Sequence, residues 1–161
     1  MRCAVKSQPW AWRHGNLIYE PLPGGLGIGR MKGLHVGVIG AGRSGLAAAR
    51  LLKRLGAKVL LSDRREIHGS VPRGIEVESG HHTRRLLDCD LIIRSPGVPG
   101  DLPILNRIRR QGIPVWSELE LASRYAKTKH LVAVTGTNGK TTTTTLIGKI
   151  FKKAGRNTVL E

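Results

Sequence analysis

The run Gly136–Thr141 has the residue types of a phosphate-binding loop. Backbone N–H groups of a glycine-rich turn at the start of a helix bind phosphate oxygens, and glycines let the backbone approach the ligand. Lys140 is then placed to contact the β- and γ-phosphates as a catalytic cation, and Thr141 to offer its hydroxyl to Mg²⁺. The general Walker pattern requires a glycine where Val134 stands, so this is a shorter form of such a loop, or else a plain glycine-rich turn. The predicted ATP contacts are Gly136, Thr137, Asn138, Gly139, Lys140, Thr141 and Thr142.

A second glycine turn, Gly40-x-Gly42-x-x-Gly45, lies between an expected strand and an expected helix. With Asp63 at the end of the next strand, it has the form of a dinucleotide fingerprint. The pattern alone leaves open NAD, another diphosphate or no ligand. Arg64 and Arg65 directly after Asp63 favour an anion nearby. Ser95-Pro96-Gly97 ends a further strand at the same edge of the sheet, where open α/β sheets bind ligands.

Composition and charge exclude several classes of protein. The formal net charge of +16 attracts anions, but we find no basic patch interleaved with aromatic residues that would predict nucleic-acid binding. No apolar run approaches the roughly 20 residues that span a bilayer. The two cysteines, Cys3 and Cys89, make neither a disulfide framework nor a metal site, which favours a reducing cytosol. His81 and His82 have no further metal ligands at suitable spacing and are interpreted as solvated loop residues.

The order of the elements predicts an α/β fold. Short apolar runs alternate with segments of helical spacing, as in a mostly parallel sheet with right-handed crossovers. The expected strands are 34–39, 58–62, 91–95, 113–116, 130–134 and 157–160. The expected helices are 46–55, 104–111, 119–125 and 141–154.

These elements divide the chain into three parts. Residues 1–30 lack sustained periodicity and are expected to be a disordered leader or translated upstream sequence, with Met31 as the natural start; a short extension that packs on the fold is the alternative. Residues 31–126 are predicted to form a Rossmann-like domain. Residues 127–161 hold a strand, the phosphate loop, a helix and part of a strand, too little for a domain by itself. They are interpreted as the truncated beginning of a P-loop NTPase-like domain.

Several of these segments resemble the Mur ligase family of ATP-dependent amide ligases. Val134–Thr142 is similar to the ATP loop of that family, which folylpolyglutamate synthases share. Val38–Leu46, Ser95–Pro99 and Ser117–Leu121 resemble in particular the branch that adds D-glutamate during peptidoglycan precursor synthesis. The resemblance covers roughly Met31–Glu161.

The resemblance implies that the first domain binds the UDP part of UDP-N-acetylmuramoyl-L-alanine and that the second binds ATP and Mg²⁺. The implied reaction passes through an acyl phosphate, which the amine of D-glutamate attacks. The D-glutamate site is not expected in this chain, so the chain alone is expected to be inactive; the full-length enzyme is expected to be cytoplasmic and monomeric. The alternatives are another Mur ligase, an NAD(P)-binding oxidoreductase or sensor domain, and a non-catalytic nucleotide-binding module. The implied UDP-substrate contacts are Gly42, Arg43, Ser44, Gly45, Asp63, Arg64, Ser95, Pro96 and Gly97.

Overall fold

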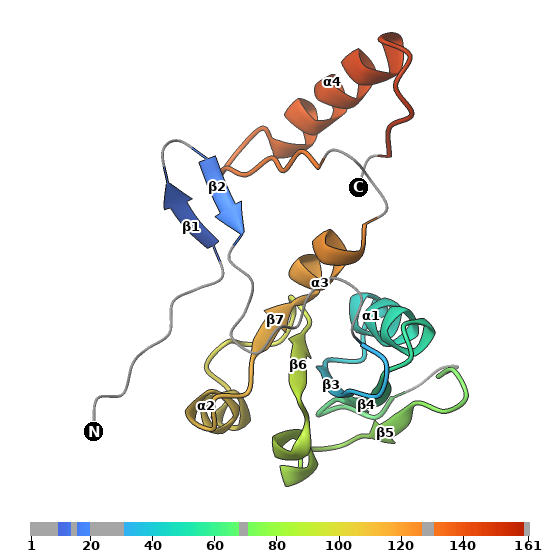
Figure 1. Ribbon diagram of the computed structural model, residues 1–161, viewed down its shortest axis with the longest axis vertical. Coiled ribbons are helices and arrows are strands. Elements are labelled where there is room, and N and C mark those ends of the chain that lie inside the picture. The colour runs from blue at the N-terminus through green and yellow to red at the C-terminus, as the bar shows by residue number, and fades with distance from the viewer. Residues whose placement is uncertain (1–9, 14–15, 20–30, 68–70, 127–130, 160–161) are drawn as a thin grey trace. The chain divides into compact units, whose positions relative to one another are not determined.

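The computed structural model describes residues 10–13, 16–19, 31–67, 71–126 and 131–159 (Figure 1). The chain divides into two compact units, Met1–Ala126 and Lys127–Glu161, and each is described by itself.

A five-stranded parallel sheet forms the centre of the first unit, which confirms the predicted fold class. Its strands lie in the order β5-β4-β3-β6-β7. The chain therefore runs from β3 outward to β5 and then returns to begin again at β6, so the strand order reverses between β3 and β6. This switch point is where open α/β sheets bind ligands. The strands are β3 (His35–Ile39), β4 (Lys58–Ser62), β5 (Glu76–Glu78), β6 (Leu91–Arg94) and β7 (Val115–Ser117).

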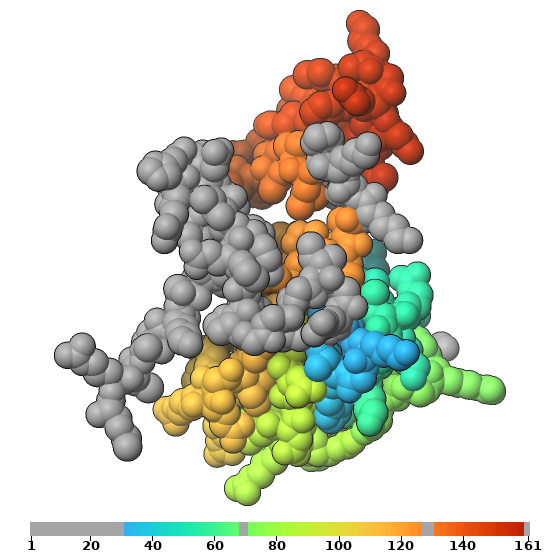
Figure 2. All heavy atoms as spheres, viewed as in Figure 1, coloured from blue at the N-terminus to red at the C-terminus, as the bar shows by residue number. Residues whose placement is uncertain are grey.

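Helices cover both faces of the sheet because its strands bury side chains alternately on each face. On one face, α1 (Arg43–Arg54) and α3 (Glu118–Tyr125) pack in the core that contains Val36 and Val38. On the other face, α2 (Pro103–Arg110) and the 3₁₀ helix η1 (Arg84–Asp88) pack in the core around Ile39. Figure 2 draws the same elements as spheres, and the coloured atoms of the first unit are closely packed.

Local sequence explains where the helices begin. Ser117 precedes α3, and its Oγ accepts a hydrogen bond from the Glu120 N–H at 3.0 Å, as an N-cap serine does. Pro103 occupies the first turn of α2, where its missing N–H costs nothing. The helix α1 begins at Arg43, earlier than the predicted Leu46, because Gly42 already serves as its N-cap. These starts bring the helix N-termini to the loops that follow the strands.

Other expectations about elements are wrong or incomplete. Strand β5 and helix η1 were not expected; β5 is a three-residue edge strand with mostly exposed side chains, so its apolar pattern is weak. The expected strands at 130–134 and 157–160 do not form in their described parts, residues 131–134 and 157–159. A strand needs a hydrogen-bonded neighbour, and the second unit has no strand among its described residues.

The expected leader contains two paired strands in its described parts, residues 10–13 and 16–19. Strand β1 (Trp10–Arg13) pairs antiparallel with β2 (Asn16–Tyr19), more regular structure than its sequence predicts. Met31, the expected start, is buried in the core at 2% exposure; its role as start stays a prediction. In the parts of the chain that the structure describes, no helix has the length and apolar character to cross a membrane.

Candidate functional site

The first glycine turn connects β3 to α1 by close backbone packing. A Cβ atom on Gly45 would lie 1.7 Å from the Gly40 carbonyl oxygen, so no side chain fits there. The Gly40 N–H donates to the Ser62 carbonyl at 2.8 Å, which holds the turn against the end of β4. The N-terminus of α1 is thereby fixed at the carboxyl edge of the sheet.

The N-terminus of α1 is suited to bind an anion. Gly42 is the N-cap, no side chain caps the helix, and its first turn carries no acidic residue. The first helical hydrogen bond runs from the Leu46 N–H to the Gly42 carbonyl, so the N–H groups before Leu46 point out of the helix end. Arg43 is exposed beside them. The partial positive charge of the helix end and the guanidinium would act together on a phosphate.

Asp63 ties the end of β4 to the first glycine turn. Its Oδ2 accepts a hydrogen bond from the Ala41 N–H at 2.7 Å, and its Oδ1 accepts one from the Arg65 N–H at 2.9 Å. Burial raises the pKa of this carboxyl, but the two backbone hydrogen bonds and the Arg65 guanidinium outweigh that effect and lower the pKa overall. Asp63 is therefore ionised at neutral pH, and both of its oxygens have backbone partners.

Ser95 bridges the two strands on either side of the switch point. It follows β6 and is 6% exposed. Its N–H donates to the Ile39 carbonyl at 3.0 Å, and its Oγ donates to the Gly40 carbonyl at 3.1 Å. The segment that includes Pro96 and Gly97 is thus held opposite the first glycine turn.

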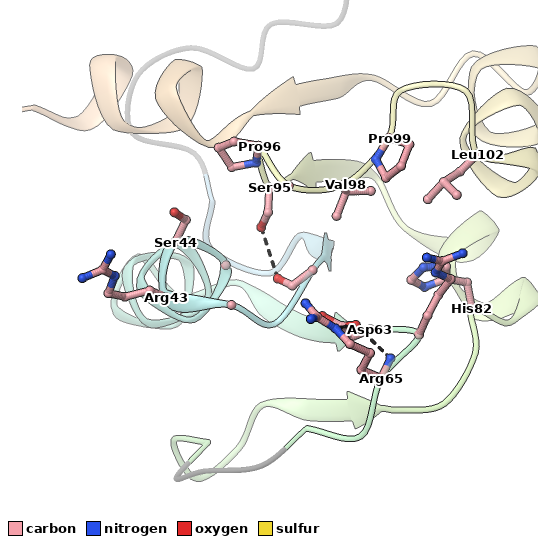
Figure 3. Close-up of a pocket in the computed structure, with 15 residues that line it drawn as sticks. Arg43, Ser44, Asp63, Arg65, His82, Ser95, Pro96, Val98, Pro99 and Leu102 are labelled. Carbon is pink, nitrogen blue, oxygen red and sulfur yellow. Dashed lines mark hydrogen bonds and ion pairs between the residues drawn. The ribbon is translucent and has the colours of Figure 1, made fainter.

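These three loops enclose a cavity of about 450 Å³ (Figure 3). All of the predicted UDP-substrate contacts line it, which brings residues from the ends of β3, β4 and β6 together. Arg43, Arg64 and Arg65 supply positive charge at this cavity. Six further residues line it that were not among the predicted contacts, although Gly40 and Arg65 had been noted beside them: Gly40, Arg65, His82, Val98, Pro99 and Leu102.

The interpretation of His82 as a solvated loop residue is wrong. His82 is partly buried, lines the cavity, and its Nδ1 lies 2.8 Å from the Ser62 Oγ. His81 is exposed, as expected. Strand β5 places His82 here, since a loop after a parallel strand reaches the same sheet edge, but β5 itself has too weak an apolar pattern to be found in the sequence.

The second glycine loop lies at the start of α4 (Lys140–Lys153) in the second unit. Gly139 is the N-cap with φ +76°, a left-handed conformation that favours glycine. The Lys140 ammonium donates to the Gly136 carbonyl at 2.6 Å and lies 3.4 Å from the Thr137 carbonyl. The predicted ATP contacts therefore form one continuous exposed loop and helix start. Within the described ranges, no group of three or more His, Cys, Asp or Glu side chains is arranged for a metal ion.

The sheet, the switch-point cavity and the second glycine loop together define a Mur-type ligase architecture. The sequence family described as "Mur ligase MurD-like, N-terminal domain" matches residues 34–117, more than half of the chain, and the chain belongs to this family.

Proteins named UDP-N-acetylmuramoylalanine--D-glutamate ligase are similar to most of the chain. The one from Elusimicrobium minutum is 47% identical over 131 residues, covering 80% of this chain and 29% of the relative. The one from Koribacter versatilis is 47% identical over 138 residues, covering 81% and 30%. The chain thus spans less than a third of these relatives.

Two solved structures of Mur ligases have the same fold. The UDP-N-acetylmuramate-alanine ligase MurC from Thermotoga maritima matches with a TM-score of 0.50 at 28% identity, over 76% of this chain and 30% of that one. The UDP-N-acetylmuramate:L-alanyl-gamma-D-glutamyl-meso-diaminopimelate ligase from Neisseria meningitides matches with a TM-score of 0.52 at 24% identity, over 76% and 40%. The second likeness bears on the fold alone.

Proposed function

We propose that this chain supplies the UDP-substrate site and the first part of the ATP site of a ligase of peptidoglycan precursor synthesis. That ligase adds D-glutamate to UDP-N-acetylmuramoyl-L-alanine. The observation that carries the proposal is the gathering of all the predicted UDP-substrate contacts on one cavity at the switch point. Membership of the MurD-like family supports the choice of substrate.

Charge supports a diphosphate at the α1 end of the cavity. The N–H groups that begin at Arg43, with the guanidinium of the same residue, would bind the phosphates, and Ser44 adds a hydroxyl. The uridine would then lie beside Asp63, Arg64 and the Ser95–Gly97 segment. Together, these contacts suit a ligand that has negative charge at one end and a flat polar ring at the other.

The hydrogen bonds of Asp63 show that this residue has a structural role beside any contact with a ligand. In the dinucleotide fingerprint the acidic residue after the second strand accepts hydrogen bonds from a ribose hydroxyl. Here both oxygens of Asp63 already accept backbone N–H groups, at 2.7 and 2.9 Å. The carboxylate therefore has a structural task in shaping the turn. Each oxygen keeps a lone pair for a ligand, so the choice of the ligase over an NAD(P)-linked oxidoreductase rests on membership of the MurD-like family.

The second unit fits the phosphate part of ATP. The open N-terminus of α4 and the exposed Lys140 would hold the β- and γ-phosphates, and the Thr141 hydroxyl would reach Mg²⁺. ATP supplies the phosphoryl group that activates the substrate carboxylate for the amine of D-glutamate. Lys140 neutralises charge at that transfer. We infer that the 161-residue chain alone performs no ligation, and that the full-length enzyme is a cytoplasmic monomer.

Calorimetry with the 161-residue chain tests the choice of ligand. We expect UDP-N-acetylmuramoyl-L-alanine to bind more tightly than NAD, because the cavity offers cations to a diphosphate and the chain belongs to the MurD-like family. An Arg43→Ala variant should weaken binding of the UDP-substrate roughly 10-fold, the typical loss of one charge-assisted hydrogen bond. Arg50→Ala on an exposed turn of the same helix is the matched control and should bind normally. Tighter binding of NAD would overturn the proposal in favour of the oxidoreductase.

A further inference from the structure

A chain of hydrogen bonds below the cavity fixes the orientation of His82. The Ser62 Oγ, fully buried at the end of β4, donates to the Glu78 Oε2 at 2.6 Å. The same Oγ lies 2.8 Å from the Nδ1 of His82. The other oxygen of Glu78 accepts from the Thr83 N–H at 3.1 Å. The imidazole is thus held from the side of the sheet, by residues at the ends of β4 and β5.

These contacts also determine which ring nitrogen carries the proton. Burial raises the pKa of Glu78, but hydrogen bonds from Ser62 and Thr83 outweigh it and lower the pKa overall, so Glu78 is ionised. A carboxylate only accepts, so the single hydroxyl proton of Ser62 goes to Glu78. The Ser62 oxygen must then accept from Nδ1–H of His82. Burial also lowers the pKa of His82, more than Glu78 and Asp63 raise it, so the ring is neutral and its Nε2 is an acceptor.

His82 lies at the end of the cavity away from the anion-binding turn. Figure 3 shows Arg43 and Ser44 at one end of the drawn site and His82 and Leu102 at the other, with Val98 between them. A nucleoside diphosphate whose phosphates lie at α1 extends its base toward this second end. The apolar side chains of Leu102 and Val98 suit the faces of a ring, and an imidazole suits its polar edge.

We propose that His82 selects uracil, because its Nε2 accepts a hydrogen bond from the imide N3–H of the base while Ser62 and Glu78 hold the required tautomer. This inference rests on the proposed function, since it assumes a uridine diphosphate in the cavity. Cytosine has an unprotonated N3, so its lone pair would face that of Nε2. His82 is therefore a specificity-determining residue of the UDP-substrate site.

Calorimetry with UDP and CDP tests this assignment on the 161-residue chain. We expect the wild-type chain to bind UDP roughly 10-fold more tightly than CDP, because UDP makes one hydrogen bond to His82 that CDP lacks. His82→Ala should weaken UDP binding by a similar factor and leave CDP binding unchanged, so that the preference disappears. His82→Gln, whose amide oxygen can replace Nε2 as the acceptor, should keep part of the preference. The exposed neighbour supplies the matched control, and His81→Ala should behave as the wild type.

The outcomes separate the two proposals. If the wild type binds neither UDP nor the full UDP-substrate, the proposed function fails. If it binds UDP and CDP equally, or if His82→Ala keeps the preference, only the role of His82 is overturned. Equal weakening of both nucleotides in His82→Ala would assign His82 a structural role and also overturn selection. Titration with 2′-deoxy-UDP tests whether His82 contacts the ribose instead. If the wild type binds 2′-deoxy-UDP more weakly than UDP and His82→Ala binds the two equally, His82 contacts the sugar hydroxyl, and the assignment to uracil is overturned.

Discussion

The two glycine turns have the same plan in sequence and different surroundings in the structure. The turn at Gly40–Gly45 packs against Ser95 and the ends of β3 and β4. The turn at Gly136–Thr141 is exposed, and its lysine bonds to carbonyls of its own loop. One turn is part of a site with three neighbouring loops. The other has the local features of a phosphate site and few neighbours among the described residues of its unit.

This difference shows which features of a nucleotide site depend only on the residues of one turn and which depend on neighbouring loops. A left-handed glycine and an open helix N-terminus are present in the second turn, although the described residues of its unit form no sheet. A cavity needs loops from several parallel strands that end at the same edge. The exposed apolar side chains of α4, which include Leu146, Ile150 and Phe151, indicate that this helix has an apolar face without cover from the described residues of its unit. Variants in the second turn therefore probe a single motif, whereas variants in the first turn probe a site built from several loops.

The largest expected effect concerns Lys140. In a full-length D-glutamate ligase that contains this chain, Lys140→Ala should lower kcat by about 10²–10³-fold, because it removes a cation from the transferring phosphoryl group. Binding of the UDP-substrate should not change, since that cavity lies in the other unit. Steady-state kinetics and calorimetry on the same variant measure the two effects. Lys140→Arg should restore little, because a planar guanidinium does not replace a compact ammonium. Near-normal turnover of Lys140→Ala would show that this loop is not the ATP site.

A smaller effect, on stability, separates the packed turn from the exposed one. Gly45→Ala places a Cβ 1.7 Å from the Gly40 carbonyl and 2.8 Å from the Ser95 Oγ, both in the packed core of the site. We expect a loss of about 3 kcal/mol and a Tm lower by roughly 15 °C in the thermal unfolding of the first unit. Gly139→Ala strains its own loop by about 1 kcal/mol and should leave that Tm unchanged.

Gly97→Ala is the control for Gly45→Ala. It adds a methyl group where no heavy atom lies within 4 Å, so the Tm should change by no more than the equivalent of about 0.5 kcal/mol. Circular dichroism melts of the three variants suffice. An equal loss in Gly45→Ala and Gly97→Ala would contradict the close packing of the turn on the helix.

Much of the fold could be predicted because the buried strands have strong local patterns. The interior strand β4 was predicted with its observed bounds, since four of its five residues are buried and apolar or small. The edge strand β5 was missed because only one of its three residues is buried, and that residue is the charged Glu78. The expected strand at 130–134 failed for the opposite reason. Its pattern is apolar, but pairing depends on partners that a local pattern does not contain.

The candidate site was predictable where its residues lie in glycine or proline turns after predicted strands. Those turns have few possible conformations, and the parallel order brings them to one edge. His82 was not predictable in this way, because its place depends on a hydrogen bond to Ser62, twenty residues away in the sequence. The role of Asp63 could also be predicted only in part from the sequence. Its position was predicted, but its two backbone partners follow from the turn geometry.

The smallest expected effect is a pH dependence of stability that arises from ionisable groups at the packed site. Asp63 and Glu78 both have pKa values that are lowered in the folded chain. A carboxyl with a lowered folded pKa stabilises the fold above its unfolded pKa, and this contribution is lost as the pH falls through the folded value. The ordinary values are 3.8 for Asp and 4.5 for Glu, so the loss from these two carboxyls should begin near pH 4.5 and increase below it. His82, whose pKa is also lowered, should add a loss that begins at higher pH, near its ordinary value of 6.5. Melts of the 161-residue chain between pH 7 and pH 3 measure it.

The variant Glu78→Gln should show how much of the pH dependence of stability comes from the carboxylate that orients Ser62 and His82. The variant lacks the carboxylate that accepts the Ser62 proton, so it should be less stable at pH 7, by about 1–3 kcal/mol for a disturbed buried hydrogen bond. Its Tm should then fall less than that of the wild type between pH 5 and pH 3, because one acid-sensitive contribution is already absent. Asp88→Asn removes an exposed carboxylate and should keep the wild-type slope. If Glu78→Gln also keeps the wild-type slope, Glu78 is not the ionised acceptor of the Ser62 proton, and the tautomer assigned to His82 loses its physical basis.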